Sequence, residues 1–227
     1  MKKLLILLFS LFLLSSPSVF ADDISDFQIE GMSIGDSLLD YMTEDEILKG
    51  IELYDGYQFL KEPYKYTEIY SNKDFQTYTN VSFFINNNST SKYISNKNEK
   101  FTILGIRGLI NYIEDFDSCL AKKDEIVSEL SKMSPNADKW GGVFEHAADP
   151  SGNSIVDAVY FEFGSGAETE VSCYNFEETF RSKINWSEGL QISIDSEEIV
   201  RWLRDENLEE LYIGNTNEKY TIPGIRE

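Results

Sequence analysis

The amino-acid sequence predicts an α+β protein in which an antiparallel sheet packs against helices that lie on one face. Apolar residues recur at steps of three and four between Asp115 and Met133, which is the period of a helix with one buried stripe. Segments on both sides of this helix alternate apolar and polar residues, which is the period of strands. These segments lack the regular alternation of strand and helix that is typical of a parallel α/β fold.

The long helix is expected to begin at Asp115 or Asp117, which can cap its first amide groups, and to end at Ser134 before a proline. Apolar and polar residues in this segment fall on opposite sides of the expected helix. We expect the stripe to contain Phe116, Cys119, Leu120, Ile126, Val127, Leu130 and Met133, with Lys122, Lys123, Asp124, Glu125 and Glu129 at the intervening positions.

The other elements follow from local signals in chain order. Two short helices come first, and Thr43 to Glu46 forms a capping box at the start of the second. The region from Ser134 to Ser154 contains Gly141-Gly142 and a turn sequence, and we expect a long connection there. The expected strands are 64–70, 81–85, 101–112, 155–163, 168–174 and 190–194, and a last helix begins after Asp195.

The first 21 residues have the pattern of a cleavable export signal. Lys2 and Lys3 precede an apolar run that is too short to span a bilayer, and a small residue, Ala21, ends the segment. No cysteine lies near the expected cleavage point to carry a lipid. We therefore expect a periplasmic or extracellular protein that begins at Asp22, without a membrane span or a lipid anchor.

Two organisations fit the remaining chain. It can form two ααβββ-like halves, 22–112 and 113–227, that meet near Tyr112, or one continuous domain. The segment from Asn217 to Arg226 repeats the segment from Asn98 to Arg107 almost residue for residue. No similarity extends upstream of either copy, so we interpret the repeat as local and not as evidence of a duplication.

The two cysteines, Cys119 and Cys173, are expected to form a disulfide. An even count of two favours a single bridge in an oxidising compartment. In the strand that contains Cys173, Val171 points the same way, whereas Glu170 and Ser172 point the other way. Cys173 should therefore face the layer in which the long helix lies.

We expect neither a metal site nor a cofactor. Two distant thiols and the single histidine, His146, offer too few ligands for zinc. Asp149, Asn153 and Asp157 do not follow the order of an EF-hand loop, and the Pro-Ser-Gly sequence among them favours a plain turn.

The charge of the chain limits its partners. The sequence has 40 acidic and 20 basic residues and a formal net charge of −20. Such a chain repels nucleic acid and anionic membranes, so the expected partner is an unknown protein or a small ligand. Solubility is the simpler interpretation of this charge, and recruitment of a basic partner is the more specific alternative.

A tyrosine-rich strand is the candidate binding surface. A spacing of two residues places Tyr64, Tyr66 and Tyr70 on one strand face, with Glu68 among them. Tyrosine gives rigid amphipathic contact area, which suits a peptide, a sugar or another protein. Tyrosine is also common in ordinary strands, so sheet packing is the alternative interpretation.

A short motif offers an alternative, enzymatic function. Gly31-Met-Ser-Ile-Gly35 matches the G-x-S-x-G pattern around a nucleophilic serine, and Gly35-Asp-Ser-Leu38 resembles the signature of the GDSL esterase family. That resemblance implies Ser37, or Ser33 in the first motif, as nucleophile. The family supplies the base from a D-x-x-H sequence, whereas His146 here is preceded by Val143 at the aspartate position.

Longer segments resemble a group of small exported bacterial proteins of unknown function. The resemblance rests on D-F-Q-I-E-G-M-S-I-G-D-S-L-L-D-Y-M-T-E-D-E-I, on the D-F-D-S-C-L-A-K-K-D-E-I-V-S-E-L helix and on the A-V-Y-F-E-F-G-S-G and V-S-C-Y strands. The Gly-Met-Ser sequence, followed by two helices and three strands, is also similar to the ααβββ module of the SmpA/BamE outer-membrane assembly lipoproteins and of β-lactamase inhibitory proteins. These resemblances imply no catalytic residues. We therefore expect an exported, non-enzymatic binding or assembly module.

Overall fold

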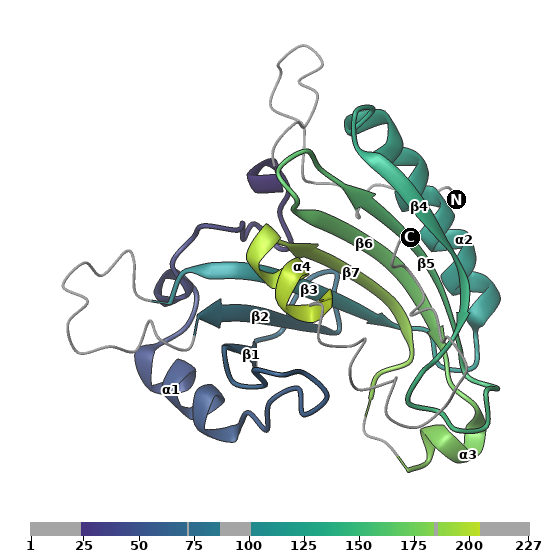
Figure 1. The fold of residues 1–227 in the computed structure, drawn as a ribbon, viewed down its shortest axis with the longest axis horizontal. Coiled ribbons are helices and arrows are strands. Elements are labelled where there is room, and N and C mark those ends of the chain that lie inside the picture. The colour runs from purple at the N-terminus through teal and green to yellow at the C-terminus, as the bar shows by residue number, and fades with distance from the viewer. Residues whose placement is uncertain (1–23, 72, 87–100, 184–185, 205–227) are drawn as a thin grey trace, which may run out of the picture.

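A seven-stranded antiparallel sheet organises the computed structural model, which describes residues 24–71, 73–86, 101–183 and 186–204 (Figure 1). The expected α+β fold with an antiparallel sheet is confirmed. The expected export signal and the repeated tail segment lie outside the described residues. From one edge to the other, the strands are β1 (Tyr66–Tyr70), β2 (Asn80–Asn86), β3 (Ile103–Asn111), β7 (Gly189–Asp195), β6 (Glu168–Asn175), β5 (Ile155–Glu162) and β4 (Asp138–Glu145).

The helices begin where the sequence supplies capping groups. Thr43 and Glu46 form the expected capping box of α1, and the Asp115 carboxylate accepts a hydrogen bond from the Ser118 backbone at the start of α2. The first expected short helix is only a 3-10 turn, Leu38–Asp40, and Ser37 makes no side-chain cap there. The α-helices of the described chain are α1 (Glu44–Leu53), α2 (Phe116–Met133), α3 (Glu178–Arg181) and α4 (Glu197–Arg204).

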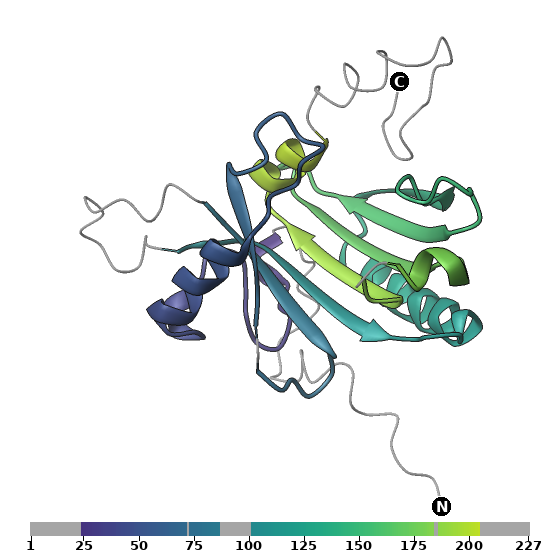
Figure 2. The same ribbon diagram turned by 90° about the horizontal axis from the view of Figure 1, so that it is seen from below.

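The two faces of the sheet are covered by different helices (Figure 2). We call face A the side that carries Cys173 and packs against α2, and face B the side that carries Glu170 and packs against α4. The long helix lies over β6 and β7, as expected of a helix layer on one face. The short helix α4 lies on the opposite face because its buried residues, Ile199 and Trp202, pack on the side chains of Tyr66 and Phe84.

The main core lies on face A and contains residues from both halves of the chain. Phe83, Ile106 and Val171 come from three strands of this core, and Ile126 and Leu130 of α2 pack on it. Strand β3 pairs along its length with β7, from Gly105 opposite Asp195 to Asn111 opposite Gly189. The sheet and the core are therefore continuous across the boundary near Tyr112.

Two ties hold α2 on face A. The expected disulfide joins Cys119 to Cys173, with a Cα–Cα distance of 6.0 Å and a sequence separation of 54. One helical turn later, the Lys123 ammonium lies 2.5 Å from a carboxylate oxygen of Asp157, which is the register partner of Cys173. Lys123 was expected on the polar side of the helix but is only 4% exposed. It lies on the buried stripe because residues four apart share a helix face.

The prediction that residues 134–154 form a connection was wrong for the eight residues of the edge strand β4. Trp140, Gly142 and Phe144 alternate with Lys139 and Val143, as in any strand. The two glycines hid this alternation. Gly141 is required by close packing, since a Cβ atom there would lie 2.1 Å from the carbonyl oxygen of Ala158.

Candidate functional site

Face B carries a continuous row of polar and aromatic side chains across the sheet. An antiparallel sheet that packs one face on a core normally leaves the other face to solvent or to a partner. On face A the corresponding row contains Ile69, Phe83, Ile106 and Ile194. On face B the strand register places seven residues side by side, and we call them the cross-sheet row: Tyr70, Ser82, Arg107, Ser193, Glu170, Tyr160 and Trp140.

Arg107 occupies the central part of this row within a hydrogen-bond network. Its guanidinium donates to the Tyr57 hydroxyl over 3.0 Å and lies 3.8 Å from a Glu68 oxygen. Tyr57 and Ser82 each donate a hydroxyl hydrogen bond of 2.6 Å to the Glu68 carboxylate, which is 7% exposed. Because every partner stands on a strand or packs on one, the network fixes the position of the guanidinium.

A second charged group connects face B to α4. Glu168 and Asp195 are direct register partners, and both are 6% exposed. The Arg204 guanidinium lies 2.6 Å from Glu168, and Ser193 donates a 2.6 Å hydrogen bond to Asp195. Burial raises the pKa of Glu168 to about 7, although Arg204 acts in the opposite direction. Burial likewise raises the pKa of Asp195 to about 6, against the effect of Arg107.

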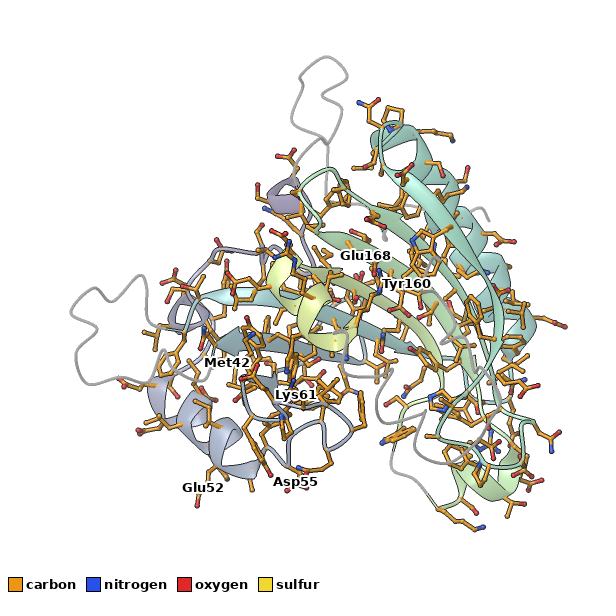
Figure 3. All side chains as sticks on the ribbon, viewed as in Figure 1. Met42, Glu52, Asp55, Lys61, Tyr160 and Glu168 are labelled. Carbon is orange, nitrogen blue, oxygen red and sulfur yellow. A yellow bond between two sulfur atoms is a disulfide. The ribbon has the colours of Figure 1, made fainter. Side chains whose placement is uncertain are left out.

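Aromatic rings form the β4 end of the cross-sheet row. The rings of Trp140 and Tyr160 are stacked, with centroids 4.1 Å apart and an interplanar angle of 15°. The Arg204 guanidinium lies 4.9 Å from the Trp140 centroid and 5.3 Å from that of Tyr160, within the range of a cation–π contact. Glu170 stands beside Tyr160 in the register, and the Tyr174 hydroxyl lies 3.5 Å from its carboxylate. Figure 3 labels Tyr160 and Glu168, which stand on neighbouring strands near α4.

His146 lies in an aromatic cluster beyond the end of β4. Its ring centroid is 5.2 Å from that of Phe176 and 5.5 Å from that of Trp186, and Tyr174 and Phe180 complete the cluster. Burial lowers the pKa of His146, against the effect of Asp149. The histidine is therefore an aromatic packing residue in this arrangement.

The structure separates the three tyrosines that the sequence places together. Tyr66 and Tyr70 lie on face B of β1 with Glu68 between them, whereas Tyr64 precedes the strand. Tyr66 is 3% exposed, packs on the Trp202 ring and donates a hydrogen bond to Glu198. Tyr64 and Tyr70 are 53% and 62% exposed. Of the three rings, only those two present substantial area to a partner.

Neither candidate nucleophile lies near the histidine. Ser33 and Ser37 are buried, and Ser37 forms a β-bridge with Thr102 immediately before β3. The strand register aligns the start of β3 with the start of β4. His146 follows the last residue of β4, which is eight residues long, so it lies at the opposite end of the sheet. At about 3.4 Å per residue, the length of β4 separates the imidazole from the serines by roughly 25 Å.

Two of the acidic residues considered as calcium ligands, Asp149 and Asp157, form hydrogen bonds or an ion pair with other side chains. The Asp149 carboxylate accepts hydrogen bonds from Ser151 and Ser154, which close the turn, and Asp157 pairs with Lys123. Within the described ranges, no group of three or more histidine, cysteine, aspartate or glutamate residues is arranged to hold a metal ion.

No helix in the described part of the chain has the length and hydropathy needed to cross a membrane.

Local sequence patterns indicate only part of the cross-sheet row. The alternation around Cys173 indicates that Glu168, Glu170 and Tyr174 point away from α2. It does not indicate that Arg107 and Trp140 stand in the same row, because that depends on the strand order.

No protein-family model, curated protein or solved structure matches this chain. The resemblances noted in the sequence stay predictions.

Proposed function

We propose that this protein is an exported, non-enzymatic binding module that holds a basic segment of a partner protein on face B. The observation that carries the proposal is the β4 end of the cross-sheet row, where the Glu170 carboxylate and the stacked rings of Tyr160 and Trp140 stand on three neighbouring strands. Preorganised side chains of this kind lower the entropy cost of binding. The disulfide is typical of proteins from oxidising compartments and supports the export part of the proposal.

The chemistry of the row favours a cationic partner. Arg204 shows how Trp140 and Tyr160 accommodate a guanidinium of this chain, and Glu170 next to them supplies a carboxylate for a second cation. The formal net charge of −20 attracts basic molecules at long range and accelerates their association.

The proposal is tested with a fluorescent arginine-rich peptide of about ten residues and a glutamate-rich peptide of equal length. We expect the arginine-rich peptide alone to bind, with affinity at least about tenfold lower for Glu170→Gln and for Trp140→Ala, in line with the loss of roughly 1.4 kcal/mol. Fluorescence anisotropy at a fixed salt concentration measures both affinities.

Two matched variants control for charge and ring loss. Glu145→Gln removes an exposed carboxylate of β4, and Trp186→Ala removes a tryptophan that is 52% exposed outside the row. Both should bind as the parent protein does. If all four variants bind the arginine-rich peptide as tightly as the parent protein does, or if the parent protein does not bind it, the site does not lie on face B.

Ester hydrolysis is not proposed as a second function because His146, the single histidine of the sequence, lies at the opposite end of the sheet from Ser33 and Ser37. Assays of short-chain esters with the parent protein and with Ser37→Ala and Ser33→Ala check this conclusion. Hydrolysis that disappears in either variant would reinstate the esterase hypothesis.

A further inference from the structure

The outer side of β4 is an edge of the sheet. Among the described strands, β4 has a single neighbour, β5, so alternate backbone amide and carbonyl groups of its eight residues point away from the sheet. Natural proteins protect such edges with proline, charged side chains, short strands or bulges, because an open edge pairs readily with another strand. This strand has no proline, and Val143 at its centre is 64% exposed.

Among the residues that the structure describes, none packs closely enough on Gly142 to require a glycine there. A Cβ atom at this position would meet only the Phe144 ring, at 3.7 Å, which is an ordinary contact. At Gly141, in contrast, a carbonyl oxygen excludes any side chain. A glycine inside a strand is costly unless a bulge, a bend or the close approach of another backbone requires it. Gly142 therefore places no side chain near the middle of the open edge, where a second strand can approach.

We propose that two copies of this chain pair antiparallel along β4, with Gly142 of one copy opposite Gly142 of the other. In this register Lys139 lies opposite Glu145 of the second copy at both ends of the pairing. Trp140 lies opposite Phe144 of the second copy in the same way. Opposite charges and aromatic pairs at directly opposed positions each stabilise an antiparallel pair by about 0.2–1 kcal/mol.

The neighbouring register is less favourable for two reasons. A shift of one residue places Asp138 opposite Glu145 of the second copy, so that like charges face each other. It also brings residues of face A opposite residues of face B, because side chains alternate along a strand. The register centred on Gly142 keeps face B of both copies on the same side of one extended sheet.

Charge reversal at the two opposed positions tests this pairing by sedimentation velocity of the disulfide-bonded protein without its signal, at about 0.1 mM and physiological salt. We expect the parent protein to form dimers. Lys139→Glu and Glu145→Lys should each weaken the dimer at least tenfold, because each places like charges at both ends. The double variant should restore the parent affinity, since it exchanges the two charges and preserves the pairing.

Lys132→Glu is the matched control, since it changes the net charge as Lys139→Glu does but lies at the end of α2. It should leave the dimer within about twofold of the parent. A monomeric parent protein, or a double variant no stronger than its single variants, would overturn the proposal.

Discussion

At the scale of single residues, the pair Glu168 and Asp195 makes the folded protein sensitive to pH. Both carboxyls are buried side by side, and burial raises the pKa of Glu168 from 4.5 to about 7. Between these two values the folded chain binds more protons than the unfolded chain, so the free energy of unfolding falls as pH rises. Asp195 acts in the same direction between 3.8 and about 6.

We predict that Glu168→Gln flattens this pH dependence. The amide keeps an acceptor for Arg204 and removes the buried charge, so the variant should gain stability relative to the parent as pH rises from 5 to 8. The full shift corresponds to on the order of 3 kcal/mol at 1.36 kcal/mol per pKa unit. Urea unfolding at a series of pH values measures the difference.

The control for this prediction is Glu52→Gln, which removes an exposed carboxylate of α1 and should follow the parent curve. Parallel pH profiles for Glu168→Gln and the parent protein would show that Glu168 does not carry the dependence.

At the scale of elements, α2 owes its position to more than its apolar stripe. The disulfide closes a long loop and adds about 4 kcal/mol on the chain-entropy model. The Lys123–Asp157 pair stands one helical turn away from it, with side-chain exposures of 5% and 20%. A buried pair adds little stability over an apolar pair, but the loss of one partner leaves an uncompensated charge.

We therefore predict that Lys123→Met destabilises the protein by roughly 2–4 kcal/mol and that a further Asp157→Asn change recovers most of this loss. Lys122→Met is the matched control, because Lys122 pairs with Glu125, which is 47% exposed, and should cost less than about 1 kcal/mol. Chemical unfolding of the oxidised proteins measures all three. Equal losses for the two lysine variants would contradict a structural role for the buried pair.

At the scale of the whole molecule, the sheet joins both halves of the chain. We predict that the fragments 22–112 and 113–227 do not fold separately. β3 would lose its pairing with β7, and the main core would be divided between the two fragments. The intact chain from residue 22 to residue 227 should unfold in one cooperative transition. Circular dichroism and calorimetry test this, and a cooperative transition in either fragment alone would contradict it.

The sequence predicted those features of the molecule that depend on neighbours along the chain. Capping of α1, the period of α2 and the direction of Cys173 follow from residues within a few positions of each other. The placement of β4 at an edge and of β7 at the centre depends on long-range pairing, which local patterns do not encode.

The candidate site could be predicted only in part for the same reason. The tyrosine strand lies at one end of the cross-sheet row, but Arg107, Glu170 and Trp140 come from three distant segments. The burial of Tyr66 arises from Trp202, which lies far away in the sequence. No local pattern reports such a contact.

The central place of β7 determines the order in which the native sheet can be completed. Among the strands that the structure describes, β7 is the last to leave the ribosome, yet it lies between β3 and β6. Until it arrives, the nascent chain consists of a β1–β3 ribbon and a β4–β6 ribbon with no strand to join them. A chain built in this order cannot complete its sheet until synthesis has passed Asp195, so the two ribbons must wait for β7 before they join.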